Sequence, residues 1–300
     1  MLKFSNYVRV ESAEEALQLL QKNKNNRIVA GGIWMRMASR RVVTAIDLSG
    51  CGLDAIEETD DEFAIGAMVT LRQLERHEGF NTLTGNVFNH AVRDIVGVQL
   101  RNSATVGGSI YGRFGFSDVL CALLPLDTYV ELTGAGRVSL ADFRDMGYVR
   151  DVIERIVVKK HDYRARYRCV RKHATDFPTL NVTAAYWNAE WHMAVGSRPL
   201  PAELLAGADC GLASAVPTEN ELRALVERVR TLSYGSNLWG SADYRRQVSG
   251  ALAVRAVCEA AGVEPPTALA DELRTVQIPQ GAECDFSERH IPGFDAKEAC

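Results

Sequence analysis

The stretch Arg101-Asn102-Ser103-Ala104-Thr105-Val106-Gly107-Gly108-Ser109-Ile110 says most about the fold of this 300-residue sequence. It follows a helix-prone segment over residues 88–98 and precedes another over residues 117–126. A glycine pair after a β-prone run exposes backbone N–H groups and tolerates positive φ. We therefore predict a turn here, at which a phosphate group can approach Gly107 and Gly108 without meeting a Cβ.

A second glycine pair lies near the N-terminus, where the short strand predicted over residues 28–30 runs into Gly31-Gly32. Neither pair fits G-x-G-x-x-G or the phosphate loop with its lysine. A single glycine pair is also typical of an ordinary tight turn. Two pairs in similar strand contexts favour a phosphate-binding role for both.

Outward from the glycine pairs, helix and strand patterns alternate along the chain. Ser12, with Glu15 three residues on, predicts the start of a helix. A meander of strands is expected over residues 167–195, followed by helices over 219–232 and 242–261. We therefore predict an α/β (α+β) fold with a first domain over residues 1–160, a second over 161–264 and an extended tail over 265–300. Further strands are predicted over residues 42–48, 63–67, 129–133, 138–140 and 152–158, and a further helix over residues 70–78.

Composition excludes several classes of protein. The chain is 47% hydrophobic and 24% charged, as expected of a soluble globular protein, and its net charge of −4 argues against a nucleic-acid partner. The seven cysteines stand singly, without the C-x-x-C spacing of zinc or iron–sulfur sites. An unpaired set suits a reducing compartment, and no segment has the length and apolarity of a membrane span or signal peptide. A cytoplasmic protein is expected.

Three blocks carry a resemblance to a known family. Ala30-Gly31-Gly32, Ile65-Gly66-Ala67 and the stretch from Arg101 to Ile110 occur here in matching order and spacing. The chain resembles the FAD-binding (medium) subunit of the xanthine dehydrogenase / carbon monoxide dehydrogenase (molybdenum hydroxylase) family. The resemblance covers about residues 1–262, and its weaker matches are Ser117-Asp118, Tyr167-Arg168 with Lys172, and Gly240 to Arg246.

The resemblance implies a vanillyl-alcohol-oxidase-like (PCMH-type), two-lobed FAD-binding domain followed by a small α/β C-terminal domain. It implies that two glycine loops surround the FAD pyrophosphate, that Asp118 reaches the ribose side and that the backbone near Ile153 borders the adenine or the isoalloxazine. It places Arg168 or Lys172 near the flavin ring, although such charges are also commonly solvated. The implied cofactor-binding residues are Arg27, Ile28, Val29, Ala30, Gly31, Gly32, Ile33, Trp34, Thr105, Val106, Gly107, Gly108, Ser109, Ser117, Asp118, Ile153, Arg168 and Lys172.

The sequence departs from the family pattern beside both glycine pairs. Ile33 and Trp34 stand where many members carry a hydroxyl or amide side chain, and residues 113–116 (Arg-Phe-Gly-Phe) replace a small polar segment. Phosphate contacts should then depend on backbone N–H groups. Trp34 either stacks on the cofactor or packs in the core.

The resemblance also implies partners. A large molybdopterin subunit would hydroxylate the substrate, by default a purine, and a small subunit with two [2Fe-2S] clusters would pass electrons to FAD and then to NAD+ or another acceptor. No G-x-S-x-G elbow, His-Glu-x-x-His pair or candidate general base is present, so neither a catalytic nor a metal-ligating residue is expected in this chain. Two alternatives stay open: a stand-alone flavin oxidoreductase, and a flavin-free scaffold or assembly protein.

Overall fold

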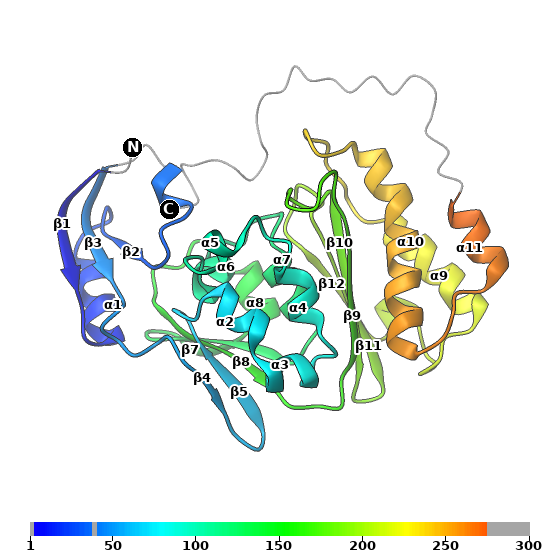
Figure 1. The fold of residues 1–300 in the computed structure, drawn as a ribbon, viewed down its shortest axis with the longest axis horizontal. Coiled ribbons are helices and arrows are strands. Elements are labelled where there is room, and N and C mark those ends of the chain that lie inside the picture. Colours follow the sequence, from blue (N-terminus) through cyan, green and yellow to red (C-terminus); the bar gives the residue numbers. More distant parts are fainter. Residues whose placement is uncertain (1–2, 38–40, 275–300) are drawn as a thin grey trace.

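Three sheets follow one another along the chain in the computed structural model, which describes residues 3–37 and 41–274 (Figure 1). The first is three-stranded in the order β1-β3-β2, the second five-stranded in the order β4-β5-β8-β6-β7, and the third four-stranded in the order β12-β11-β10-β9. A group of short helices lies between the second and third sheets. The arrangement is the mixed α/β fold that the alternating pattern predicts.

The first unit is a small parallel sheet with one helix. Its elements are β1 (Lys3–Arg9), α1 (Ala13–Lys22), β2 (Arg27–Val29), the 3-10 turn η1 (Met35–Met37) and β3 (Arg41–Asp47). Strand β3 pairs in parallel with both β1 and β2. The Ser12 hydroxyl accepts a hydrogen bond from the Glu15 N–H at 3.2 Å, which confirms the predicted helix start.

The central unit is built on the antiparallel five-stranded sheet. Its strands are β4 (Ile56–Glu58), β5 (Glu62–Gly66), β6 (Thr128–Leu132), β7 (Gly136–Ser139) and β8 (Ile153–Lys159). Its helices are α2 (Leu71–Arg76), α3 (Glu78–Leu83), α4 (Val87–Val92), α5 (Val98–Arg101), α6 (Val106–Tyr111), α7 (Asp118–Leu123) and α8 (Leu140–Asp145). The predicted helix over residues 88–98 is shorter than expected, because Val96 takes a left-handed φ of 48°.

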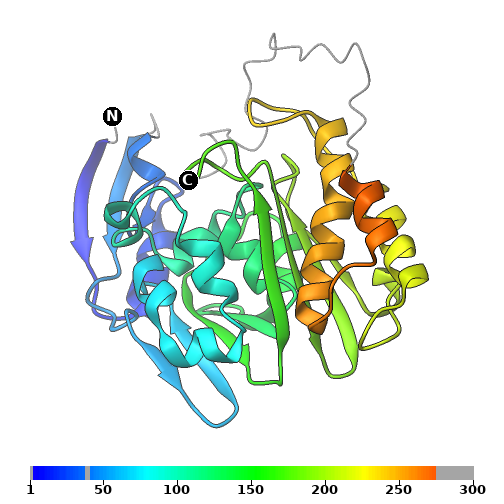
Figure 2. The same cartoon turned by 45° about the vertical axis from the view of Figure 1, so that its right-hand side comes forward.

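The C-terminal unit is an antiparallel sheet covered on both faces. Strands β9 (Arg164–Val170), β10 (Leu180–Trp187), β11 (Glu190–Gly196) and β12 (Glu203–Ala206) form it, followed by the 3-10 turn η2 (Gly207–Cys210). Helices α9 (Glu219–Arg230) and α10 (Ala242–Ala261) cover one face, as the yellow and orange helices of Figure 2 show. Helices α4 and α7 of the central unit contact the strands from the other side, so β10 is buried along most of its length.

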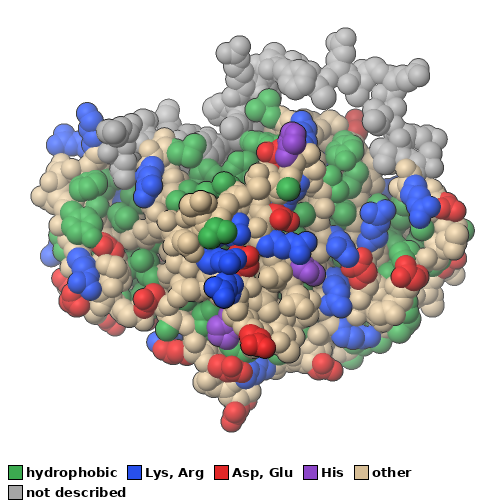
Figure 3. Space-filling view, viewed as in Figure 1, with side chains coloured by type: hydrophobic (Ala, Val, Ile, Leu, Met, Phe, Trp, Pro, Cys, Tyr) green, Lys and Arg blue, Asp and Glu red, His purple; other side chains and the backbone are tan. Residues whose placement is uncertain are grey.

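The predicted tail is wrong in its first part. Residues Thr267–Arg274 form helix α11, whose Leu269 packs into the core of the C-terminal unit with 1% of its surface exposed. The rest of the tail, residues 275–300, lies outside the described residues. Basic and acidic side chains are interspersed over the face shown in Figure 3, in keeping with the small net charge. Within residues 3–37 and 41–274, no helix is long and apolar enough to span a membrane.

Helix α9 begins with a charged cap whose effect on stability should depend on pH. Burial opposes ionisation of Glu221, but hydrogen bonds from Thr218, Ala213 and Ser214 outweigh it and lower the pKa of this carboxyl from 4.5 to about 2. A lowered pKa in the folded state adds stability above the unfolded value, and the gain is lost as the pH falls. We expect Glu221→Gln to cost about 1 kcal/mol at neutral pH, a figure reduced for solvent screening. Urea unfolding should show this difference shrinking between pH 4.5 and about 2; a difference independent of pH would contradict the assignment.

Candidate functional site

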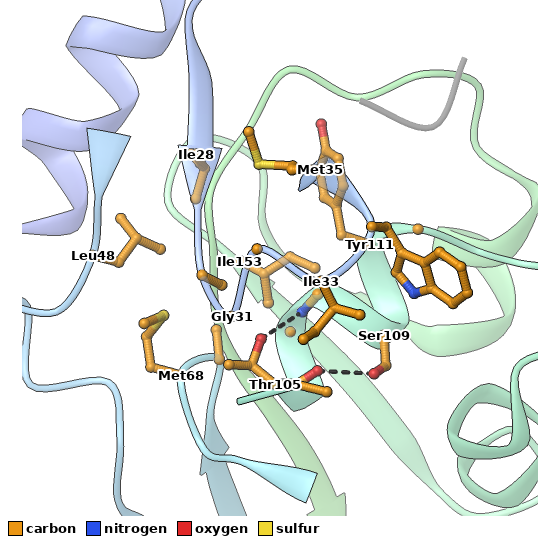
Figure 4. Close-up of a pocket in the computed structure, with 18 of the residues that line it drawn as sticks. Ile28, Gly31, Ile33, Met35, Leu48, Met68, Thr105, Ser109, Tyr111 and Ile153 are labelled. Carbon is orange, nitrogen blue, oxygen red and sulfur yellow. Dashed lines mark hydrogen bonds between the residues drawn. The ribbon is translucent and has the colours of Figure 1, made fainter. Parts of the chain in front are cut away.

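A cleft lies between the first unit and the central unit, with about 1070 Å³ of empty space when its open mouth is included. Its walls come from both glycine loops, from the ends of β2 and β3, from α6 and from the segment before β8 (Figure 4). The predicted site residues that line it are Arg27, Ile28, Ala30, Gly31, Gly32, Ile33, Trp34, Thr105, Gly107, Gly108, Ser109 and Ile153.

Two of the glycines are required by close approach of the backbone. A Cβ on Gly31 would lie 1.7 Å from the carbonyl oxygen of Ser103, in the segment that leads into α6. A Cβ on Gly107 would lie 2.6 Å from the Cβ of Ala67, just after β5. Real Cβ contacts are never this short. The three sequence blocks that looked separate therefore pack against one another at one end of the cleft.

The two glycine loops differ in the hydrogen-bond donors that they offer. The N–H groups of Gly31, Gly32 and Ile33 donate to no residue in the described part of the chain, and Gly32 has a left-handed φ of 66°. Consecutive free N–H groups around a left-handed residue form an anion-binding concavity. The first loop thus has the geometry predicted for a phosphate.

The second loop does not match its prediction. Gly107 N–H donates to Ala67 O at 3.0 Å and Gly108 N–H to Thr105 Oγ1 at 3.2 Å, so both donors are already used. Neither glycine has positive φ, because both lie within α6 rather than in a turn. The Thr105 hydroxyl caps this helix, and the Ser109 hydroxyl donates to Thr105 O at 2.9 Å (Figure 4). Gly107 serves close packing, and the second loop forms a wall.

Trp34 belongs to an aromatic cluster at the cleft wall. Its ring centroid lies 5.2 Å from Phe114, 5.3 Å from Phe116 and 5.9 Å from Phe177. Phe177 in turn meets Trp239 edge-on at 5.3 Å. Trp34 therefore packs, as one of its two predicted roles requires, and also lines the cleft. The aromatic residues that depart from the family pattern support one another.

Asp118 does not reach the cleft. It is 5% exposed, pairs with Arg171 at 2.9 Å and accepts hydrogen bonds from Tyr167 and Asn181. Burial raises the pKa of its carboxyl, while the Arg171 guanidinium acts in the opposite direction. These contacts tie α7 to strands β9 and β10, so the side chain predicted to meet a ribose instead joins two units.

Five other predicted residues also lie outside the cleft lining. Arg168 pairs with Glu259 of α10 at 3.0 Å, and the Lys172 ammonium donates to Leu238 O at 2.7 Å. The Ser117 hydroxyl caps α7 by accepting from Leu120 N–H. The remaining two are Val29 within β2 and Val106 in the core. The structure therefore brings together the residues of the glycine loops and not the basic residues of β9 and the loop after it.

Sequence reasoning missed the apolar side of the cleft. Ile28, Leu48 and Met68 lie on one side of Gly31, and Ile33, Ser109 and Tyr111 lie on the other (Figure 4). Leu20 lines the cleft as well. We refer to Leu20, Ile28, Leu48 and Met68 as the apolar slot. Nothing in the sequence separates these residues from ordinary core positions, because the strand and helix patterns already account for them.

Asp151 is the one acidic side chain that lines the cleft among the described residues. Its carboxylate accepts hydrogen bonds from the N–H groups of Gly134 and Ala135 at 2.9 Å and of Val152 at 2.8 Å. It is 6% exposed and is held as the anchor of a turn. An acid fixed by three amides is a poor candidate for a general base.

Comparison with known proteins gives consistent results. Residues 2–159 match the family described as the FAD binding domain in molybdopterin dehydrogenase. The chain is 28% identical over 193 residues to the glyceraldehyde dehydrogenase medium chain of Sulfolobus acidocaldarius, covering 60% of this chain and 68% of that one. It is 26% identical over 287 residues to the nicotine 6-hydroxylase medium subunit of Paenarthrobacter nicotinovorans, covering 85% and 96%.

Solved structures show the same fold. A chain of quinoline 2-oxidoreductase from Pseudomonas putida 86 superposes with a TM-score of 0.76 at 20% identity, covering 86% of this chain and 97% of that one. A chain of carbon monoxide dehydrogenase from Hydrogenophaga pseudoflava superposes with a TM-score of 0.78 at 21% identity, covering 87% and 97%. The likeness extends beyond the matched domain into the C-terminal unit.

Proposed function

Because the chain belongs to the family of FAD-binding domains in molybdopterin dehydrogenases, we propose that it is the flavin-binding electron-transfer subunit of a multi-subunit molybdenum hydroxylase. The single observation that carries this proposal is the row of free N–H groups at Gly31, Gly32 and Ile33, placed between the apolar slot and the Ser109 side of the cleft. A dinucleotide needs that order: a ring site, a phosphate site and a second ring site.

The residues of the cleft fit FAD. The absence of a Cβ at Gly31 lets the first loop lie directly against Ser103, and the left-handed Gly32 turns successive amides toward one place. The Arg27 guanidinium donates to Lys24 O at 2.6 Å and Asn26 O at 2.8 Å, so it stiffens the loop entry rather than standing free for the phosphates. Backbone amides would therefore hold the pyrophosphate.

When bound, FAD supplies the capacity to accept electrons and to pass them on singly or in pairs. The residues of this chain position and enclose it. Trp34 and its phenylalanine neighbours form the wall beyond the phosphate site, and the aromatic cluster keeps water from that side. Asp151, the one acid that lines the described part of the cleft, is held by three amides, which supports a substrate site on a partner subunit.

That assignment implies partners and an architecture. We propose a large molybdopterin subunit and a small [2Fe-2S] subunit as partners, with NAD+ or a similar carrier as acceptor. We also propose a PCMH-type domain over residues 1–160 and a C-terminal domain that begins at residue 161 and, in place of the boundary first expected at 264, includes helix α11. The relatives are named for glyceraldehyde and nicotine, so an aldehyde or an aromatic N-heterocycle is the proposed substrate class in place of the purine first expected.

The first test is the flavin content of the purified chain. We expect about one FAD per chain, held without a covalent bond, because no histidine or cysteine lines the described part of the cleft. Acid denaturation should therefore release the flavin into solution. Flavin retained by the precipitate would contradict non-covalent binding. A chain without any flavin would favour the scaffold alternative.

The second part of the test concerns the partners. Expressed with its proposed partner subunits, the chain should co-purify with molybdenum and iron. Alone it should oxidise neither an aldehyde nor an N-heterocycle at the expense of an acceptor dye, since no candidate general base lines the described part of the cleft. Turnover of such a substrate by the isolated chain would instead support a stand-alone flavin oxidoreductase.

A further inference from the structure

Helix α5 leads into the backbone that supports the first glycine loop. A Cβ on Gly31 would lie 1.7 Å from Ser103 O, so the loop rests directly on the chain just after α5. The N–H groups of Ser103 and Ala104 both donate to Leu100 O, at 2.9 and 2.7 Å, which makes this backbone an extension of the helix. The position of α5 therefore decides where the free N–H groups of the first loop lie.

A helix as short as α5 is unstable by itself, and apolar packing does little to hold it in place. Among its four residues, all of which the structure describes, only Arg101 is buried. Val98 is 43% exposed, and neither Val98 nor Leu100 belongs to the apolar core of the central unit. The loop before the helix contains Val96, which is 48% exposed. Another kind of contact must fix α5.

The buried contact of α5 is an ion pair. The Arg101 guanidinium donates through Nε to the Glu75 carboxylate of α2 at 2.8 Å and through a terminal nitrogen to Ile95 O at 3.1 Å. Arg101 is 5% exposed and Glu75 is 6% exposed. The second oxygen of the carboxylate accepts from Arg72 at 2.6 Å. Glu75 is thus held between two arginines, and Arg101 joins α5 to α2.

Helix α2 is a firm support for this pair. Thr70 and Gln73 form a capping box at its N-terminus. At its other end, the side-chain amide of Asn81 donates to the carbonyl oxygens of Leu74 at 3.1 Å and Glu75 at 3.2 Å. Because both ends of α2 are tied, the Glu75 carboxylate offers Arg101 a fixed point of attachment.

We propose that Arg101 is a positioning residue for the flavin cofactor. Its pair with Glu75 fixes α5, and through Ser103 it holds the first glycine loop where the loop's free N–H groups meet the pyrophosphate. The inference rests on the proposed FAD-binding function. A buried ion pair adds little stability compared with apolar side chains of similar volume, but its hydrogen bonds have a defined direction. Arg101 lies outside the cleft lining, so it acts without touching FAD.

The test measures FAD affinity and thermal stability separately in the full chain. Isothermal titration of FAD into protein stripped of flavin gives the dissociation constant, and the melting temperature of the same flavin-free protein gives the stability. Arg101→Met should weaken FAD binding about tenfold, the scale of one lost hydrogen bond to a charged group. The variant should still fold, because Glu75 keeps its contact with Arg72.

A double variant separates positioning from stability. Arg101→Met combined with Glu75→Leu replaces the ion pair by apolar side chains, so its melting temperature should lie within about 2 °C of the wild type. Its FAD affinity should stay about tenfold weaker, because apolar side chains give α5 no defined direction. Arg101→Lys keeps the charge beside Glu75 and should recover part of the affinity.

Arg164→Met is the control. It removes a partly buried arginine of the C-terminal unit, which donates to Ala215 O at 3.2 Å and lies over the Tyr186 ring at 4.3 Å. This variant should melt at a lower temperature than the wild type and bind FAD with unchanged affinity.

The outcomes distinguish this proposal from the proposed function. If Arg101→Met binds FAD as tightly as the wild type, or if the double variant regains wild-type affinity together with its stability, the positioning role is overturned while FAD binding stands. Should Arg101→Met not fold, the double variant decides alone. If the wild-type chain binds no FAD, the proposed function fails and the positioning proposal fails with it.

Discussion

Gly31→Ala is expected to abolish FAD binding. The added Cβ would lie 1.7 Å from Ser103 O and 2.6 Å from the carbonyl carbon of the same residue. Both are backbone atoms, so no side-chain rotation relieves the contact, and the first loop must move away from the segment that leads into α6. Loss of two charge-assisted hydrogen bonds to the pyrophosphate, at about 1.5–3 kcal/mol each, lowers affinity by roughly 100-fold or more.

Two glycines in the same chain provide matched controls. Gly32 and Gly136 both have positive φ and no atom within 4 Å of an added Cβ. Alanine at either position costs about 1–2 kcal/mol of backbone strain without a clash. Gly136→Ala, at the start of β7, should keep its flavin, whereas Gly32→Ala should lose part of it because the strain falls within the row of free amides of the first loop. The flavin-to-protein absorbance ratio measures all three variants, and full occupancy in Gly31→Ala would show that FAD binds elsewhere.

The glycine pairs could be located from the sequence, but their individual roles could not. A strand followed by Gly-Gly correctly marked the first loop, after β2, whereas Gly107 and Gly108 lie within helix α6. Which glycine is needed for close packing depends on Ser103 and Ala67, residues brought near by tertiary structure. Gly108 shows the limit most clearly, since we expected a bare phosphate contact and found a helical residue whose N–H is used by Thr105. The second Gly-Gly pair therefore belongs to the first turn of helix α6, which the Thr105 hydroxyl caps, and not to a loop between elements.

The other predicted ligands, such as Asp118 and Arg168, lie outside the cleft lining for a different reason. Asp118 is the residue type that the resemblance requires, but Arg171, in the loop just after β9, pairs with it in the interior of the protein. Arg168 likewise finds Glu259 of α10, which is 91 residues away in sequence. A charged residue read in isolation suggests a ligand contact, whereas in the folded chain the nearest opposite charge decides its role. Nine of the twelve described strands were predicted, because alternation of apolar and polar residues is a local signal, whereas β1, β4 and β12 were missed.

The aromatic wall of the cleft depends on a loop of the C-terminal unit. Trp239 meets Phe177 edge-on, and Phe177 stacks on Trp34. Trp239 is carried by residues 235–240, and the side chain that organises this loop is Arg245 of α10. Arg245 is 1% exposed, and burial lowers the pKa of its guanidinium to about 10, so it stays charged at neutral pH.

Arg245→Met is expected to destabilise the protein by roughly 4 kcal/mol, the scale for removing a buried, fully hydrogen-bonded charge. The guanidinium donates only to uncharged acceptors, so methionine leaves several of them buried without a partner. The acceptors are the carbonyl oxygens of Thr179, Ser197, Gly235 and Gly240 and the side-chain oxygen of Asn237.

Arg246→Met is the matched control for this substitution, because the neighbouring guanidinium is 43% exposed, pairs with Asp243 at 2.7 Å and lies over the Tyr234 ring at 5.9 Å. An exposed pair of this kind contributes about 0.5 kcal/mol. At about 2–4 °C per kcal/mol for a protein of this size, Arg245→Met should melt roughly 10 °C lower and Arg246→Met within about 2 °C of the wild type. Since Trp239 then loses its support, tryptophan fluorescence should report opening of the aromatic cluster before global unfolding. Equal melting temperatures for the two variants would mean that loop 235–240 holds its shape without Arg245, and that the cleft wall is independent of the C-terminal unit.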